Sequence, residues 1–324
     1  MVMGACHHGG VTRIEVTHFS DPCCPWAYSA SPAHAVLRWR YGAQLDWRLR
    51  LIGLTEEAAQ YVARGYTPTR SALGYKRFRR FGMPLGGQPR ERVTATGRAC
   101  RAVVATRLLD PPREMEAFRA LQLAQFTTTL LLDTDDGLRE ALARVDGLDV
   151  EAVLEALDRE DVERAYQDDR AAARTAEGSA TEAMGRAART DGPVRYTAPS
   201  LLFRHPDGRV LDGGGFQPLE AYDVLLANLE PRLERRAPAE NPVEVLRVLP
   251  FAATTREIAA CMTPNLAPVD DDAAEDALIE AAGAGTVVRE PVGDRALWRL
   301  DGERRFERQG ASRSTTQSPD GSRR

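Results

Sequence analysis

Two adjacent cysteines, Cys23 and Cys24, stand where the sequence pattern changes from strand to helix. Residues 13–19 are rich in β-branched and aromatic side chains and lead into Ser-Asp-Pro, which is typical of a strand that ends in a turn. Pro25 has a fixed φ and no amide hydrogen, so it suits the first helical position and places Cys24 at the N-cap. Unpaired N–H groups and the positive end of the helix dipole favour a thiolate there, and they lower thiol pKa values to roughly 3.5–7.5 in such sites. Cys24 is therefore the candidate nucleophile.

The motif Cys24-Pro25-Trp26-Ala27 resembles the active site of the thioredoxin superfamily, in particular its DsbA/FrnE-like family, where Cys-Pro-Trp-Cys or a close variant follows the first strand. Ala27 occupies the position of that family's second, resolving cysteine. A site with two cysteines releases its mixed-disulfide partner by attack of the second thiol, whereas a site with one depends on an external thiol. The resemblance therefore implies an oxidoreductase with one reactive thiol. A small thiol such as mycothiol or glutathione would be its co-substrate, with no tightly bound cofactor and no metal.

Cys23 is the nearest thiol that could replace the missing cysteine. Adjacent Cα atoms lie about 3.8 Å apart, below the usual 4.4–6.8 Å of a disulfide, so a Cys23–Cys24 bridge would be strained. Such a bond could exist transiently as a redox switch. The sequence favours the alternative, in which Cys23 is a small buried residue that closes the strand.

A second segment, Thr197-Ala198-Pro199, resembles the cis-proline loop of the same superfamily. Cis peptide bonds are essentially a feature of proline. The resemblance implies that Pro199 packs beside Cys24 and that the backbone of Ala198 pairs with an extended ligand that carries a thiol. The implied catalytic residues are Cys24 and Pro199. The residues implied to contact substrate are Cys23, Pro25, Trp26, Ala27, Tyr28 and Ala198.

The surrounding pattern predicts the elements that hold these two segments together. A strand at 13–19, a helix at 25–41 and an alternating strand at 45–51 form a βαβ unit. Helical periodicity then dominates 55–190, with helices expected over 91–109 and 115–132. The order ends with a strand at 195–203, a turn at 205–208, a strand at 209–211 and a helix from 218. This order resembles the DsbA-like arrangement over 11–232 and implies an α/β, thioredoxin-like fold with a helical insertion at about 55–190.

One part of the insertion, residues 74–82, combines aromatic and basic side chains. Its aromatic residues recur every third position, and its cations fall mostly on the other side. The cations are Lys76, Arg77, Arg79 and Arg80. An amphipathic helix with a solvated basic face explains the pattern. The alternatives are a docking surface for a carboxylate-bearing thiol or substrate and, least favoured, a nucleic-acid contact.

The character of the chain changes again after residue 232. Residues 233–242 form a polar, proline-containing linker, and 243–301 resemble a small α+β winged-helix domain. Its second helix, from Asp271 to about Ala282, carries many carboxylates and no basic residue. A helix that reads DNA needs Arg, Asn or Gln side chains that contact bases and phosphates. DNA binding is therefore not favoured. The sequence instead favours contact of this domain with a protein partner or with a second copy of the chain. Residues 302–324 are expected to be disordered.

Composition argues against a protein whose main task is to bind nucleic acid. The 324 residues are enough for two domains, and the formal net charge is −4. Five scattered cysteines do not form a disulfide framework, and Cys100 and Cys261 are expected to be buried structural thiols. Residues 1–10 lack a signal-peptide core, so a cytoplasmic location without membrane contact is expected. A metal site at Cys6-His7-His8 is not favoured.

Three functions fit these observations. The first is a thiol-disulfide oxidoreductase that uses Cys24 alone. The second is a thiol-dependent isomerase or thiol transferase for a small metabolite, because loss of the second cysteine removes the stable dithiol disulfide as a product. The third is a redox-responsive regulator, with Cys24 as the sensor and the winged-helix-like domain as the output.

Overall fold

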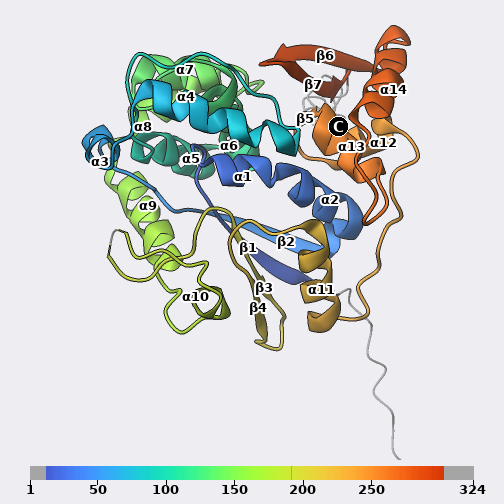
Figure 1. Cartoon of the computed structure of the whole chain (residues 1–324), viewed down its shortest axis with the longest axis horizontal. Helices are drawn as coiled ribbons and strands as arrows, with labels where there is room; N and C mark the ends of the chain where they lie inside the picture. The colour runs from blue at the N-terminus through green and yellow to red at the C-terminus, as the bar shows by residue number, and fades with distance from the viewer. Residues whose placement is uncertain (1–11, 191, 303–324) are drawn as a thin grey trace, which may run out of the picture.

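A four-stranded mixed sheet organises the computed structural model, which describes residues 12–190 and 192–302 (Figure 1). Its strands are β1 (Ile14–Ser20), β2 (Leu45–Leu51), β3 (Ser200–Arg204) and β4 (Val210–Gly213), in the order β2-β1-β3-β4. Strand β2 runs parallel to β1, from the pair Ile14 and Leu45 to the pair Ser20 and Leu51. Strands β3 and β4 are antiparallel to their neighbours. The predicted α/β fold is confirmed, and β1 and β2 are parallel because a helical crossover connects them.

The crossover between β1 and β2 differs from the prediction of one helix over 25–41. It consists of two helices, α1 (Pro25–Ser29) and α2 (Ser31–Tyr41), followed by a 3₁₀ turn, η1 (Gly42–Gln44). Pro32 lies in the first turn of α2. Because proline has no N–H, it cannot donate to the carbonyl four residues earlier, and the first helix ends at that point. The break leaves α1 as a short helix whose first turn belongs to the cysteine motif.

Helix α11 (Leu219–Leu229) and α2 share one hydrophobic cluster with the sheet. The cluster joins Leu37 and Tyr41 of α2 to Tyr222 and Leu226 of α11 over Ile14 and other strand residues. The five side chains named here are each at most 3% exposed. Burial of large apolar side chains is worth roughly 1.5–3 kcal/mol each, so this cluster fixes α2 and, through it, the start of α1.

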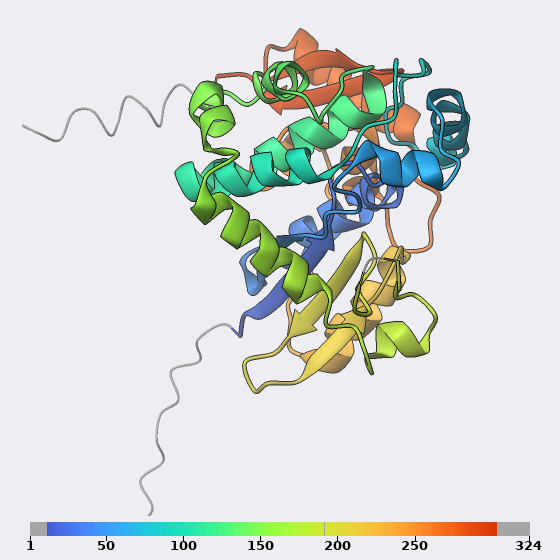
Figure 2. The ribbon, with the colours of Figure 1, turned by 90° about the vertical axis from the view of Figure 1, so that its left-hand side faces the viewer.

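The helical segment between β2 and β3 packs on Leu49 and Leu51 of β2 through α5 and α6, and the end of α9 packs near Phe19 of β1. Figure 2 shows the long helix α9 running beside the sheet, with α5 and α6 above it. Its helices are α3 (Ala58–Ala63), α4 (Pro68–Lys76), α5 (Gly97–Leu109), α6 (Glu114–Thr127), α7 (Asp135–Leu142), α8 (Val150–Ala156), α9 (Glu160–Ala173) and α10 (Ala180–Ala183), with 3₁₀ turns η2 (Arg77–Phe81) and η3 (Pro111–Arg113).

The helices predicted over 91–109 and 115–132 are shorter than expected. Residues 82–96 form a long irregular segment instead of the first turns of α5. Tertiary contacts hold it there: Arg92 pairs with Asp133, the Ala95 amide donates to the same carboxylate, and Arg90 donates to the carbonyls of Gln125, Thr128 and Leu130. Those carbonyls lie at or beyond the end of α6, where helix carbonyls lack partners.

The C-terminal elements stand beside α2, at the upper right of Figure 1. They are α12 (Pro242–Val248), β5 (Ala253–Thr254), α13 (Thr255–Met262), α14 (Asp271–Gly283), β6 (Val287–Val292) and β7 (Arg295–Leu300), and their sheet has the order β5-β7-β6. Trp298, Ile258 and Leu246 pack in one cluster with Val36 and Trp39 of α2. The sequence analysis missed α12 and β5; the likeness to a winged helix and the domain boundaries remain predictions. Within 12–190 and 192–302 no helix is long and apolar enough to cross a membrane.

Two predictions fall on residues that the structure leaves undescribed. The segment Cys6-His7-His8 and the predicted tail from 303 onward both lie outside the described ranges. Cys100 and Cys261 lie inside them, and both are buried as predicted, with 0% and 1% of their surface exposed.

Candidate active site

Cys24 occupies the N-cap of α1, with Pro25 as the first helical residue. Its backbone is extended (φ −84°, ψ 117°), and its carbonyl accepts the first helical hydrogen bond, from the Tyr28 amide at 3.0 Å. The peptide bond between Ala198 and Pro199 is cis, and the Cys24 Sγ donates to the Ala198 carbonyl at 3.2 Å. The two segments, 174 residues apart in the chain, therefore meet at this sulfur.

Burial shifts the pKa of the Cys24 thiol upward, whereas the sequence predicted a downward shift. The residue is 5% exposed, and desolvation raises the pKa of its thiol to about 12. The N–H groups of Ala27 and Trp26 lower the pKa, as expected at a helix N-terminus, while the Asp21 carboxylate raises it further. The expectation of a lowered pKa was wrong, because the free-energy penalty of removing the thiolate charge from water exceeds the stabilisation that two amide dipoles provide. The resting form in this structure is a thiol that donates to a carbonyl.

Asp21 is a site residue that the sequence analysis treated only as part of a turn. Its carboxylate is fully buried and accepts from the amides of Cys23 (2.8 Å) and Leu54 (2.9 Å), and from the Thr96 hydroxyl (2.8 Å). The Cys100 thiol lies 3.5 Å from the same carboxylate. The position directly after a strand and before Pro22 was the available signal, since Asp there can bind the amide two residues on. Asp21 thus fixes the loop that presents both cysteines.

Trp26 is the most exposed side chain of the motif, at 41%. Its ring contacts those of Phe78, Phe81 and Phe216, with centroid separations of 4.9, 5.9 and 5.4 Å. Phe78 and Phe81 belong to η2, where three residues complete one turn, so the period of three noticed in the sequence places both rings on one side. The predicted amphipathic helix over 74–82 is therefore the end of α4 followed by a 3₁₀ turn.

Ala27 and Tyr28 lie beneath the surface. Ala27 is 2% exposed, and its amide is directed at the Cys24 sulfur. Tyr28 is 1% exposed, stacks on Phe126 with ring centroids 4.7 Å apart, and donates its hydroxyl to the Pro84 carbonyl at 2.8 Å. These contacts of Tyr28 are structural, and its predicted contact with substrate remains a prediction.

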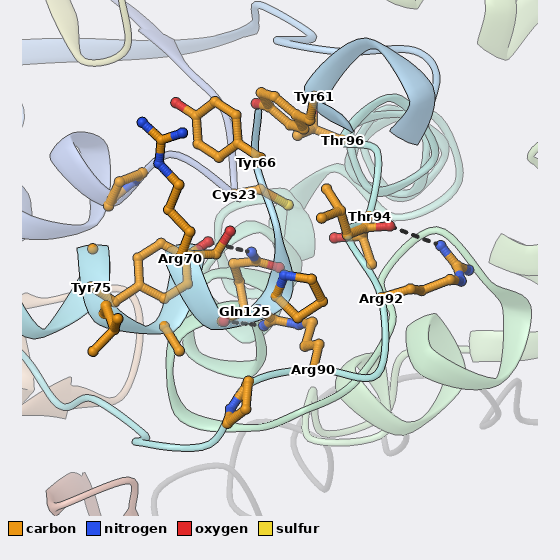
Figure 3. A pocket seen from close by; sticks show the side chains of 18 of the residues that line it. Cys23, Tyr61, Tyr66, Arg70, Tyr75, Arg90, Arg92, Thr94, Thr96 and Gln125 are labelled. Atoms are coloured by element: carbon orange, nitrogen blue, oxygen red, sulfur yellow. Dashed lines mark hydrogen bonds between the residues drawn. The ribbon is translucent and has the colours of Figure 1, made fainter. Parts of the chain in front are cut away.

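A pocket of about 750 Å³ opens beside the motif, between α3, α4 and the irregular segment 88–96 (Figure 3). Of the predicted site residues, Cys23, Pro25 and Trp26 line it, whereas Cys24, Ala198 and Pro199 do not. Ligand pockets usually measure roughly 300–1,000 Å³. Tyr61, Tyr66, Arg70, Arg90 and Arg92 also line it, and the sequence analysis assigned none of them to the site. Whether these side chains reach the pocket depends on the path of the loops, which cannot be predicted from hydrophobic periodicity.

The two adjacent thiols face different surroundings. Cys23 is 8% exposed and lies on the pocket wall, where Figure 3 shows it among the labelled residues, whereas Cys24 faces the cis-proline loop. Both thiols are free, and no bond joins them. Burial, followed by the charge of Asp21, raises the pKa of Cys23 well above its ordinary value, and the Arg90 guanidinium opposes this.

No metal centre is visible in the described part of the chain. Between residues 12 and 302, residue 191 apart, no group of three or more His, Cys, Asp or Glu side chains is arranged to hold an ion.

Comparison with known families places this fold and site in a class. The model of the DSBA-like thioredoxin domain matches residues 15–177. This range spans β1, the cysteine motif, β2 and most of the helical segment, so the chain belongs to the DSBA-like thioredoxin family. It is accordingly a thiol-disulfide oxidoreductase-like enzyme.

Several solved structures match the chain at low sequence identity. The cytosolic disulfide reductase DsbM from Pseudomonas aeruginosa is 20% identical with a TM-score of 0.46, and the comparison covers 68% of this chain and 98% of that one. A candidate disulfide isomerase from Nitrosomonas europaea is 17% identical with a TM-score of 0.49, and 67% of this chain and 97% of that chain are covered. No protein with a curated description matches the chain.

Proposed function

We propose that this protein catalyses thiol-disulfide exchange through Cys24 alone, and that an external small thiol completes each cycle. The observation that carries the proposal is the position of the Cys24 sulfur. It lies at the N-terminus of α1, at hydrogen-bond distance from Ala198 and with Ala27 in place of a second cysteine.

The reaction consists of two exchanges. The Cys24 thiolate attacks one sulfur of a substrate disulfide, forms a mixed disulfide and releases the other half as a thiolate, which takes up a proton. A small thiol, as its thiolate, then attacks the substrate sulfur of the mixed disulfide and returns the electron pair to Cys24. The N–H groups of Trp26 and Ala27 stabilise Cys24 as nucleophile and as leaving group. The Ala198 backbone positions the substrate beside the sulfur.

Mycothiol and glutathione are both small thiols with the chemistry that this role needs, and they differ in charge. We place the reaction in the cytoplasm, where pools of such thiols are kept reduced.

The test follows reduction of a peptide mixed disulfide by a small thiol, with wild type and Cys24→Ser compared. We expect turnover that depends on the small-thiol concentration in the wild type, with loss of at least 100-fold in Cys24→Ser. A Cys23→Ser variant, which keeps the adjacent nucleophile, is the matched control and should retain turnover. Equal activity of Cys24→Ser and wild type would exclude the proposal.

A second candidate is thiol-dependent isomerisation or thiol transfer on a small metabolite. The pocket of about 750 Å³ favours it, because a protein disulfide needs no enclosed space of this size. Conversion of an unsaturated acid in the presence of a thiol, without net oxidation, would distinguish this activity from exchange.

We further propose that residues 243–301 serve as a structural or protein-contacting unit and not as a DNA reader. Helix α14 begins with Asp270 as its N-cap and carries Asp271 and Asp272 in its first turn, so this end would repel phosphates.

A further inference from the structure

The pocket beside the motif is lined by cations and by no carboxylate. Arginines at five positions contribute to its wall, and no Asp or Glu does so among the described residues. They are Arg64, Arg70, Arg77, Arg90 and Arg92. Only Arg92 has a carboxylate partner within the described ranges, Asp133, at 2.6 and 2.8 Å. A concave surface with one sign of charge concentrates ligands of the opposite sign.

Three of these cations come from one wall, formed by the end of α3, by α4 and by η2. Arg64, Arg70 and Arg77 are exposed, and no carboxylate of the described chain lies within ion-pair distance of them. Arg70 donates one N–H to the Gly65 carbonyl at 2.9 Å, and its remaining donors are available. Figure 3 shows its side chain, with that of Tyr66, among those that line the pocket.

Arg90 supplies a charge from the opposite side. Its guanidinium donates to three backbone carbonyls, those of Leu130, Gln125 and Thr128. These acceptors orient the group, and no carboxylate of the described chain forms an ion pair with it. The pocket therefore presents cations from two walls.

Gln125 provides an independent sign that a ligand occupies this space. Its side chain lines the pocket and is 4% exposed, yet its Oε1 has no hydrogen-bond partner among the described residues. The Nε2 of the same amide lies 3.3 Å from the Tyr75 hydroxyl. If the amide is turned the other way, the hydroxyl satisfies the oxygen and the NH₂ group is left. In either orientation one buried polar end lacks a partner, and such groups in native proteins are normally satisfied.

We propose that this pocket binds the acidic part of the small thiol that completes the reaction at Cys24, so that the thiol is an anion-bearing one and not a neutral sugar thiol such as mycothiol. This inference rests on the proposed function for the role of the ligand. Pro25 and Trp26, which directly follow Cys24 in the chain, form part of the pocket wall, so the arginines hold the acidic part of the ligand one and two residues from the reacting cysteine, which does not itself line the pocket. Its thiolate attacks the substrate sulfur of the mixed disulfide, a new disulfide leaves, and Cys24 keeps the electron pair.

Binding is measured by calorimetry on the full-length wild-type chain with ligands that cannot exchange disulfides. The main probe is S-methylglutathione, and its diethyl ester, which keeps the amino group but lacks both carboxylates, is the matched ligand without negative charge. Desulfo-coenzyme A presents phosphates instead of carboxylates and thus distinguishes the two sources of negative charge. We expect an acidic probe to bind at least tenfold more tightly than the ester, and its affinity to fall with added salt because ions screen exposed charges.

The arginines are tested by Arg70→Gln and Arg77→Gln. Each is expected to weaken acidic-probe binding about tenfold, since a charge-assisted hydrogen bond contributes roughly 1.5–3 kcal/mol and 1.4 kcal/mol corresponds to a factor of ten. Arg80→Gln removes the same charge from the same basic run but does not line the pocket, so it should leave binding within about twofold. Gln125→Leu should weaken binding as well, by removing the unpartnered amide.

The outcomes separate this inference from the proposed function. Tight binding of S-methylglutathione or of desulfo-coenzyme A, weakened by Arg70→Gln but not by Arg80→Gln, supports the site even if Cys24 shows no turnover. Equal binding of the ester and the acid, no binding of either acidic probe, or equal effects of Arg70→Gln and Arg80→Gln would overturn it. Turnover with Cys24 would stand in each of those cases.

Discussion

At the scale of single residues, the environment of Cys24 sets its reactivity more than its place in the helix does. The N-cap position supplies two amide donors, but 5% exposure removes the water that would otherwise solvate a thiolate. The Ala198 carbonyl stabilises the protonated form, because it can accept a hydrogen bond from a thiol and not from a thiolate. A ligand that takes the place of this carbonyl would therefore favour ionisation of the sulfur.

The first prediction concerns the pH dependence of Cys24 alkylation in the free protein. With a pKa of about 12, only about one sulfur in 100,000 is ionised at pH 7. The rate of reaction with iodoacetamide should therefore rise about tenfold per pH unit from pH 7 to 10 without a plateau. Peptide-level mass spectrometry follows Cys24, with free cysteine as the reference, which levels off near its pKa of about 8.5. A plateau below pH 8 would contradict this prediction.

The raised pKa of Cys24 also makes the stability of the folded protein fall at alkaline pH. The folded-state pKa of Cys24 is raised, so the thiol remains protonated in the fold at a pH where the unfolded chain has released its proton. Its contribution to stability is complete below the unfolded-state pKa and is lost as pH rises towards about 12. Cys24→Ala should reduce this loss of stability at alkaline pH.

The second prediction restores the missing cysteine. Ala27 is buried, and its amide is directed at the Cys24 sulfur. In Ala27→Cys the two thiols are three residues apart in the first turn of α1, and we expect an intramolecular disulfide to form under mild oxidation. Thiol titration should show two fewer free thiols than in the reduced protein, and turnover should become less dependent on the small thiol. Ala27→Ser is the matched control, and formation of no disulfide in Ala27→Cys would contradict the geometry.

At the scale of elements, the sequence predicted those parts whose pattern is local. The alternation of Leu45, Leu49 and Leu51 defines β2, and Pro25 after two cysteines defines the start of α1. The meeting of Cys24 with Ala198 was available only through the resemblance of two short motifs to a family. The irregular segment 82–96 could not be predicted, because Arg90 and Arg92 hold it through contacts with residues 35 to 41 positions away. The arginine pocket depends on that segment, so the sequence indicated basic residues but not their common cavity.

The third prediction concerns the support of this segment by the C-terminal strands. The turn between β6 and β7 brings Asp294 to the Leu85 amide, which donates to its carboxylate at 2.9 Å. Asp294→Ala should remove about 1 kcal/mol of local stability. We expect faster hydrogen exchange at the Leu85 amide, measured by NMR. Asp276→Ala, at an exposed position of α14, is the control and should leave that amide unchanged; equal exchange in both variants would show that the contact does not restrain the segment.

At the scale of the whole molecule, the C-terminal elements are joined to the thioredoxin-like part by buried polar contacts as well as apolar ones. Arg40 of α2 pairs with Asp223 of α11 and also donates to Asn265 at 2.7 Å. The Trp39 indole donates to the Ala237 carbonyl at 2.8 Å. Both residues belong to α2, the helix that follows the cysteine motif. We therefore expect the C-terminal elements to influence the stability of the site without contributing a reacting group.

The last prediction tests this coupling at Arg119 and Glu257, which join α6 to α13. Arg119 Nη1 and Nη2 lie 2.7 Å from the two oxygens of Glu257, and the residues are 5% and 0% exposed. Glu257→Gln leaves a buried guanidinium without its counter-ion, and we expect a loss of about 3–5 kcal/mol in the free energy of unfolding. Denaturant unfolding measures it.

A double-mutant cycle with Arg119→Leu separates the ion pair from other effects of the substitutions. Because the double variant contains no unpaired charge, it should be less destabilised than the sum of the two single variants, by more than about 1 kcal/mol. Glu151→Gln removes one partner of the exposed Arg139–Glu151 pair and should cost less than about 1 kcal/mol. If Glu257→Gln were no more destabilising than Glu151→Gln, the pair would not hold the C-terminal elements, and apolar packing of Trp298 and Val36 alone would have to join the two parts of the chain.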